Sequence, residues 1–165
     1  MTGVSCLEKR KSPYISSDIS HTFRYPIFSE PPSLDWNKIT DAESALIVQN
    51  LMEGLVDYDF SKGKTIRVKP GLAQSWSSSP DKRHWVFYLK QSVYWSDGRL
   101  LTPQDFIDSW ERLLNPKTGA EYAYFLFPIK NAQAYNQGKI KDFKKVGMSI
   151  GASGELQIEL KKGIS

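Results

Sequence analysis

The sequence predicts an α/β fold in which helices cover a β-sheet, and three observations carry this prediction. The run HWVFYLK at 84–90 has the aromatic and β-branched content of a strand. Residues 102–114 space their apolar side chains as a helix does. Two alternating runs, 146–150 and 155–160, flank the turn GASG and predict a terminal hairpin.

The N-terminal half supplies the first elements. Residues 1–20 are polar and rich in Ser and Lys, which predicts a disordered tail. Alternating aromatics at 21–28 predict a short strand before Glu30-Pro31-Pro32. Residues 44–55 have the apolar spacing of a helix, and 56–58 and 66–69 read as strands on either side of the loop FSKGKT.

The helix at 102–114 has the clearest boundaries in the chain. Thr102 suits the N-cap, Pro103 the first helical position, and Asp105 the positive helix start. Before it, Ser96-Asp97-Gly98 predicts a chain reversal, because Gly98 tolerates a positive φ. After it, YAYFLFPIKNAQAYNQGK predicts one or two short helices that end at Gly138.

Composition bounds the function classes. The 165 residues are 40% hydrophobic and 24% charged, which suffices for one compact domain or slightly more. The net charge is +4, but the basic residues fall in several separate groups, so we expect solvated surface and no nucleic-acid binding. No long segment lacks charges, so the sequence predicts no transmembrane helix.

Cys6 is the only cysteine, which excludes an internal disulfide framework. Two interpretations of it stay open. It is an exposed thiol in the tail, or a lipid-modified cysteine, since Val4-Ser5-Cys6 is similar to the cleavage site of a bacterial lipoprotein signal. No apolar stretch precedes it, so the sequence as written contains no export signal.

Catalytic and metal-binding patterns are missing from the sequence. His21 and His84 are the only histidines, and neither lies beside a second metal ligand at a familiar spacing. Phosphate-binding glycine patterns do not occur. Asp105 and Asp108 are interpreted as solvated helix surface. We therefore expect no enzyme activity, no cofactor and no metal.

The aromatic residues divide into two groups. Trp85, Trp95 and Trp110 lie in elements where they would fill a core. Tyr122 and Tyr124 follow a Pro-Lys-Thr-Gly turn, from which a side chain can point into a cleft.

Five segments, in register along residues 22–162, resemble the extracellular solute-binding proteins of peptide ABC importers, the oligopeptide- and dipeptide-binding family 5. Any one of these segments alone would be a weak signal, but five in the family's order are specific. They are PPSLDWNKITDAESALIVQNLMEGLVDYD, GLAQSWSSSPDKRHWVFYLKQSVYWSDG, WSDGRLLTPQDFIDSWERLLNP, NPKTGAEYAYFLFPIKNAQAYNQGK and VGMSIGASGELQIELKK.

The resemblance implies a periplasmic-binding-protein-like, type II clamshell fold, here truncated, with a mixed sheet and covering helices. Residues 21–52 would begin the first lobe, and 53–165 would form the small second domain with the terminal hairpin. Because family members are much longer, the chain would be an incomplete N-terminal portion. The alternative is a standalone protein-interaction module or a non-functional remnant.

For function, the resemblance implies a monomer that holds an extended peptide by strand addition and delivers it to membrane permease subunits. It would work in the periplasm or cell envelope, with or without a lipid anchor on Cys6. Thr40, Asp41 and Ala42 match a segment whose backbone meets the peptide, although Thr40 stands where some relatives have an acidic residue and Trp36 replaces a usual proline. Tyr122 matches a cleft tyrosine, and its other interpretation is a partly buried helix-start residue.

Overall fold

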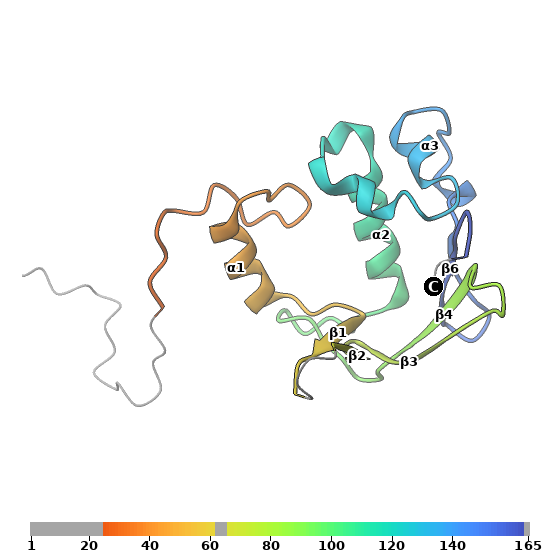
Figure 1. Cartoon of the computed structure of the whole chain (residues 1–165), viewed down its shortest axis with the longest axis horizontal. Coiled ribbons are helices and arrows are strands. Elements are labelled where there is room, and N and C mark those ends of the chain that lie inside the picture. Colours follow the sequence, from red (N-terminus) through yellow and green to blue (C-terminus); the bar gives the residue numbers. More distant parts are fainter. Residues whose placement is uncertain (1–24, 62–65, 164–165) are drawn as a thin grey trace, which may run out of the picture.

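The structure is a computed structural model that describes residues 25–61 and 66–163. Its first helix, α1 (Ala42–Leu51), leads into a two-stranded ribbon of β1 (Val56–Asp59) and β2 (Arg67–Pro70). The helix α2 (Pro103–Leu114) stands between α1 and a four-stranded sheet (Figure 1). The α/β class predicted from the sequence is therefore confirmed.

The four-stranded sheet joins segments that lie far apart in the chain. It contains β3 (Ala73–Ser78), β4 (His84–Leu89), β5 (Met148–Ile150) and β6 (Leu156–Glu159), in the order β3-β4-β6-β5. His84 on β4 pairs with Glu159 on β6, and β5 pairs with β6 as the predicted terminal hairpin. All pairs between the described strands are antiparallel, so these residues form no mixed sheet of the kind expected.

The helix α2 begins where its sequence predicts. The N–H and the hydroxyl of Thr102 both donate to the carboxylate of Asp105, at 2.7 and 2.9 Å. These bonds fix the first turn, and Pro103 has the backbone geometry that this turn needs. Asp105 is thus a helix-capping group rather than solvated surface, whereas Asp108 is exposed and accepts a bond from Gln104.

The main core lies between α2, the sheet and the segment that joins them. Its buried residues are Leu114, Ala123, Ile129, Ala132, Tyr135, Val146, Met148 and Leu160. Trp85 and Trp110 pack against this core while remaining half-buried. Trp95 is also half-buried, but it lies in the turn before α2, where the guanidinium of Arg99 is 6.0 Å from its ring.

Short helical turns connect α2 to the terminal hairpin. They are η2 (Pro116–Thr118), η3 (Glu121–Leu126), α3 (Ala132–Asn136) and η4 (Phe143–Lys145). Just after α3, Gly138 adopts a φ of +70°, which confirms its predicted role at a helix end. Gly98 has a φ of +85° in the predicted reversal before α2, and its N–H donates to the carbonyl of Trp95 at 2.9 Å.

The β1–β2 ribbon continues directly into β3, and Gly71 makes this possible. The backbone of residues 71–73 hydrogen-bonds to the carbonyls of Gly54 and Leu55. A Cβ at position 71 would collide with the carbonyl oxygen of Gly54. The chain can therefore pass from one sheet to the next only with a glycine at this point.

The structure also differs from the sequence predictions at three elements. The strand expected at 21–28 is wrong in its described part, because residues 25–28 form no strand. The helix expected at 44–55 begins two residues earlier and ends at Leu51, since Asp41 caps it and Met52 is extended. The strand β3 was not predicted.

Candidate functional site

The segment Thr40–Ala42 lies at the start of α1. Asp41 is the N-cap: its carboxylate accepts the N–H of Ser44 at 2.8 Å, and this bond lowers the pKa of Asp41 below its ordinary value. Ala42 is the first helical residue and is exposed, as is Thr40. The aspartate side chain is thus occupied within the helix cap.

An ion pair ties the segment before α1 to α2. Both guanidinium NH groups of Arg112 donate to the carboxylate of Asp35, each at 2.6 Å. The guanidinium holds the pKa of Asp35 below its usual range. Asp35 also shapes its own loop, because its carbonyl accepts the N–H groups of Lys38 and Ile39. This bidentate contact fixes where the chain enters α1.

Tyr122, from a later part of the chain, contacts the Thr40 segment. It lies on η3, and its hydroxyl is 3.5 Å from the carbonyl oxygen of Thr40, at the long limit of a hydrogen bond. The structure thus brings two of the predicted site residues together although 82 positions separate them. Tyr122 is 42% exposed, so its ring is also available to a ligand.

Two further aromatic residues extend this surface. The rings of Tyr124 and Phe125 lie 4.5 Å apart, and Tyr122 packs against both at 6.1 and 5.7 Å. All three side chains are exposed, with Phe125 at 67%. We call Tyr122, Tyr124 and Phe125 the aromatic cluster. Large exposed aromatics in contact with one another are typical of a binding surface.

Sequence reasoning missed part of this site. Phe125 was not singled out, although it follows the two tyrosines in the same turn. The Asp35–Arg112 pair has no signal in the sequence, because its partners are 77 positions apart and each is an ordinary surface residue type.

Comparison with known proteins shows the family to which this chain belongs. Residues 67–161 match the bacterial extracellular solute-binding proteins, family 5 (middle part). The chain belongs to this family. It is a family of solute-binding proteins rather than a class of enzymes.

Two family 5 relatives illustrate the likeness. The periplasmic oligopeptide-binding protein OppA of Haemophilus influenzae is 39% identical over 115 residues, which are 68% of this chain and 20% of the relative. The periplasmic murein peptide-binding protein MppA of Escherichia coli is 38% identical over 138 residues, which are 82% of this chain and 25% of the relative. The chain thus spans only a fifth to a quarter of the length of these relatives.

Solved structures of the same two proteins share the fold. The Haemophilus influenzae OppA complex with the peptide RPPGFSPFR has a TM-score of 0.74 at 32% identity, over 82% of this chain and 26% of that one. The Escherichia coli MppA structure has a TM-score of 0.74 at 36% identity, over 84% and 26%. The matched part of this chain, which is more than four fifths of it, therefore has the fold of the corresponding part of the periplasmic oligopeptide-binding proteins, as the resemblance implied.

Some sequence predictions concern residues outside the described ranges. Cys6, His21 and the tail at 1–20 all lie there. Within residues 25–61 and 66–163, no three potential metal ligands cluster. No helix in these ranges is both long and apolar enough to cross a bilayer. The division into 21–52 and 53–165 stays a prediction.

Proposed function

We propose that this chain forms part of the substrate-binding component of a peptide ABC importer. The observation that carries the proposal is the approach of Tyr122 to the Thr40 carbonyl, beside the exposed aromatic cluster. It places a backbone carbonyl, which can accept a second hydrogen bond besides that of Tyr122, next to exposed aromatic contact area, and an extended peptide uses both. The likeness to a solved peptide complex supports the same assignment.

In this proposal the backbone of Thr40, Asp41 and Ala42 pairs with the peptide, and Tyr122 packs against a peptide side chain. Asp41 acts only by capping α1, which holds the segment in place. The Asp35–Arg112 pair ties the segment before α1 to α2, the helix that precedes η3 in the chain, and so helps to hold both halves of the site together. A monomeric whole protein would present the bound peptide to the permease subunits, without enzymatic chemistry.

A chimaera gives the sharpest test, because this chain spans only about a quarter of its relatives. The chain would replace the matching part of Haemophilus influenzae OppA, and binding of RPPGFSPFR would be measured by titration calorimetry. We expect micromolar or tighter binding. Tyr122→Ala should weaken it about tenfold, as loss of an aromatic contact does.

Tyr88→Ala is the matched control, since Tyr88 is similarly exposed but lies on β4. A folded chimaera that does not bind the peptide would refute the proposal. So would equal weakening by the two tyrosine variants. Deoxycholate belongs in the same titration, because a related Escherichia coli protein (34% identical) is named as a probable deoxycholate-binding periplasmic protein. Preferential binding of deoxycholate would replace peptides as the ligand class.

A standalone interaction module is the second candidate, and the exposed apolar residues favour it. Beyond the aromatic cluster, the β1–β2 ribbon and the residues beside it expose Tyr58, Phe60, Ile66 and Val68. Self-association of the isolated chain in analytical ultracentrifugation, together with a chimaera that fails to bind, would support this role.

Localisation in the periplasm or cell envelope is part of the proposal, supported by the names of both relatives. Cys6 as a lipid-attachment site belongs to it as well. Mass spectrometry of the chain isolated from its native envelope would show the added acyl mass, and an unmodified Cys6 would leave the exposed-thiol interpretation.

A further inference from the structure

Charge is unevenly distributed along the described chain. Residues 25–61 carry a single lysine, Lys38, against seven acidic residues: Glu30, Asp35, Asp41, Glu43, Glu53, Asp57 and Asp59. Residues 130–163 reverse this balance with three acidic residues, Asp142, Glu155 and Glu159, against seven lysines: Lys130, Lys139, Lys141, Lys144, Lys145, Lys161 and Lys162. An asymmetry of this kind indicates a polyanionic partner for the basic end.

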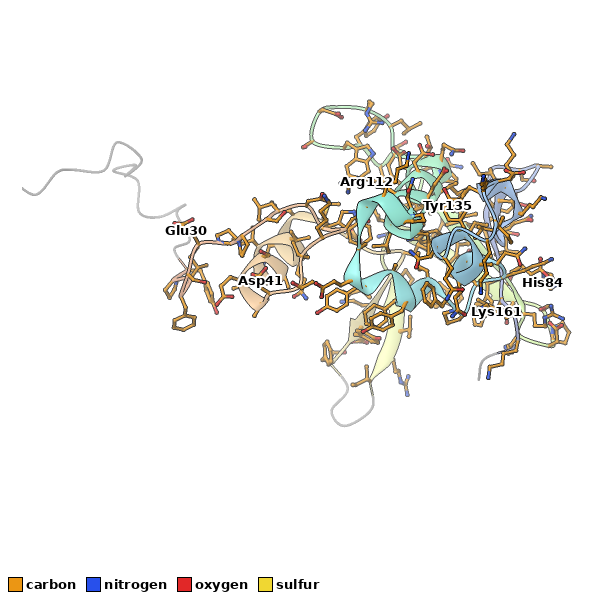
Figure 2. All side chains as sticks on the ribbon, turned by 90° about the horizontal axis from the view of Figure 1, so that it is seen from above. Glu30, Asp41, His84, Arg112, Tyr135 and Lys161 are labelled. Carbon is orange, nitrogen blue, oxygen red and sulfur yellow. The ribbon has the colours of Figure 1, made fainter. Side chains whose placement is uncertain are left out.

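The folded chain places acidic residues near one end of the molecule and basic residues near the other. Glu30 and Asp41 lie at one end and His84 and Lys161 at the other (Figure 2). In the sequence, the lysines fell into separate groups and suggested only solvated surface. The structure gathers several of them around two neighbouring hollows.

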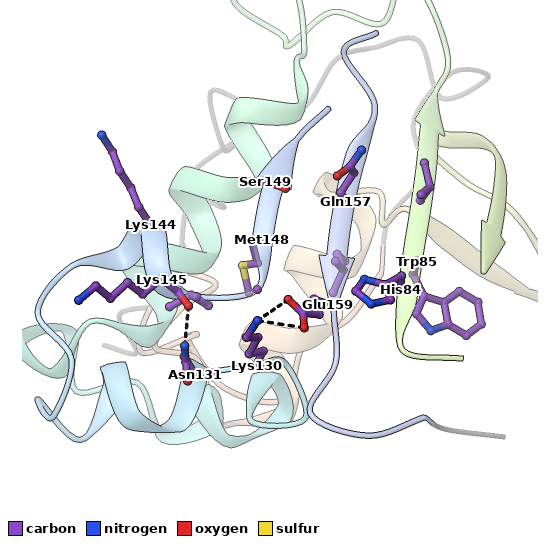
Figure 3. A pocket seen from close by; sticks show the side chains of 14 residues that line it. His84, Trp85, Lys130, Asn131, Lys144, Lys145, Met148, Ser149, Gln157 and Glu159 are labelled. Atoms are coloured by element: carbon purple, nitrogen blue, oxygen red, sulfur yellow. Dashed lines mark hydrogen bonds and ion pairs between the residues drawn. The ribbon is translucent and has the colours of Figure 1, made fainter. Parts of the chain in front are cut away.

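The first hollow, of about 590 Å³, lies over β4, β6 and β5 (Figure 3). Lys130, Lys144 and Lys145 line it. The second, of about 430 Å³, is lined by Lys130, Lys139 and Lys161. Lys130 and Asn131 belong to both, so the hollows form one continuous surface. We call the five lysines Lys130, Lys139, Lys144, Lys145 and Lys161 the basic face.

Little of this positive charge is neutralised. Glu159 is the one carboxylate that lines the hollows, and it is already bound to Lys130 at 2.8 and 3.0 Å and near Arg83 at 3.7 Å. Lys161 donates to the neutral side chain of Gln133 at 3.1 Å. Among the described residues, no carboxylate lies within ion-pair distance of Lys139, Lys144 or Lys145. These lysines are available to an external anion.

The basic face offers little to a protein or a single-stranded nucleic acid. Among the described residues, none of the large exposed hydrophobic side chains lines either hollow, and the two rings that line the first hollow are His84 and Trp85, of which Trp85 is half-buried and packs against the core. Protein interfaces are centred on buried aromatic anchors, and unpaired bases stack on exposed rings. A layer of lipid headgroups needs only several lysines on one broad surface.

We propose that the basic face binds the anionic phospholipid surface of a membrane. The contact is peripheral and electrostatic, and each lysine adds to it independently. The acidic end is repelled by the same surface. The molecule therefore adsorbs with Thr40 and Tyr122 directed away from the lipid, which leaves the candidate peptide site open. This inference does not depend on the ligand of that site.

Vesicle co-sedimentation with the purified, unlipidated 165-residue chain tests the proposal. We expect binding to phosphatidylcholine vesicles that contain one third phosphatidylglycerol, and none to pure phosphatidylcholine. Binding should weaken between about 0.03 M and about 0.15 M salt, because the Debye length shortens. Lys144→Glu/Lys145→Glu should reduce the partition coefficient about tenfold or more, since each basic residue contributes roughly a factor of five.

Lys139→Glu/Lys161→Glu, from the second hollow, should have a similar effect. Lys38→Glu/Lys117→Glu is the matched control: it changes net charge equally, but neither residue lines a hollow. Circular dichroism checks that each variant is folded. Equal loss in the control pair would overturn the proposal, because net charge alone would then explain binding. Failure to bind the anionic vesicles, or tighter binding to duplex DNA or polyglutamate at equal charge concentration, would overturn it as well.

Discussion

At the scale of single residues, the Asp35–Arg112 pair decides how the predicted site is assembled. It is the only side-chain ion pair, within the described ranges, that joins the segment before α1 to α2. The arginine is about half exposed, so solvent screens the pair, but its two parallel bonds give it a defined geometry.

Arg112→Ala should therefore lower the free energy of unfolding by about 1 kcal/mol at pH 7. The effect should depend on pH, because Arg112 lowers the pKa of Asp35 in the folded chain. A lowered carboxyl pKa stabilises the fold above the ordinary value of 3.8, and this contribution fades as the pH falls through the lowered pKa. Urea unfolding at pH 7 and near pH 2 measures the change in the free energy of unfolding and its dependence on pH.

Lys117→Ala is the control for this prediction, since Lys117 is exposed and its side chain takes part in no ion pair with the described residues. A difference between Arg112→Ala and the parent chain that stays constant down to pH 2 would contradict the electrostatic explanation.

At the scale of elements, the start of α2 depends on Asp105. Burial raises the pKa of this carboxyl, but the hydrogen bonds from Thr102 and the nearby Arg99 outweigh burial and lower it. Asp105→Ala should destabilise the fold by about 1–2 kcal/mol at neutral pH. The loss should shrink as the pH falls below 3.8 and through the lowered pKa, where the carboxyl in the folded chain becomes protonated. Asp108→Ala, one turn later and exposed, should cost under about 0.5 kcal/mol in the same unfolding experiment.

The buried face of α2 gives a second prediction. Trp110 packs against the main core and lies 5.8 Å from the ring of Phe106. Trp110→Ala should cost about 3 kcal/mol, near the lower end of values for large aromatics because the side chain is only half-buried. Thermal and urea unfolding would show it, with exposed Gln104→Ala as the control. An unchanged midpoint would mean that this face contributes no packing energy.

The helices and strands also show which parts of the fold can be predicted from the local sequence. Helix α2 was predicted almost to the residue, because Thr102, Pro103 and Asn115 mark its ends locally. Strand β3 was missed because AQSWSS is rich in serine, and its strand form comes from pairing with β4. Residues 25–28 have the aromatic content of a strand but do not form one. Residue composition alone therefore does not decide where a strand forms.

The candidate site was predicted for a different reason. Thr40 was expected through the family resemblance alone, whereas Tyr122 was expected both from that resemblance and from its place after the Pro-Lys-Thr-Gly turn. The contact between them depends on how α1, η3 and the Asp35–Arg112 pair are placed in space. The order of the family's segments along the sequence predicts that placement, whereas hydrophobic periodicity does not.

At the scale of the whole molecule, the length of the chain limits what it can hold. A peptide on Thr40 and Tyr122 would keep most of its surface in water, because the chain spans a quarter of relatives that bind such ligands. One-sided strand pairing gains only about 0.5–1.5 kcal/mol per hydrogen bond. This gain must also offset the entropy lost by the peptide.

The isolated chain should therefore show no saturable heat with RPPGFSPFR at micromolar concentration, in contrast to the chimaera. Titration of both under identical conditions is the measurement. Micromolar binding by the isolated chain, lost in Tyr122→Ala, would instead make it a compact binder on its own.

The pairing of β4 with β6 also has a consequence for synthesis on the ribosome. Strand β4 is complete once Leu89 has emerged, but its partner ends only at Glu159. One edge of HWVFYL stays unpaired throughout that interval, and aromatic strand edges attract other chains. The nascent chain is therefore most prone to aggregation between these two points. A chaperone that binds extended aromatic segments would find its target at residues 84–89.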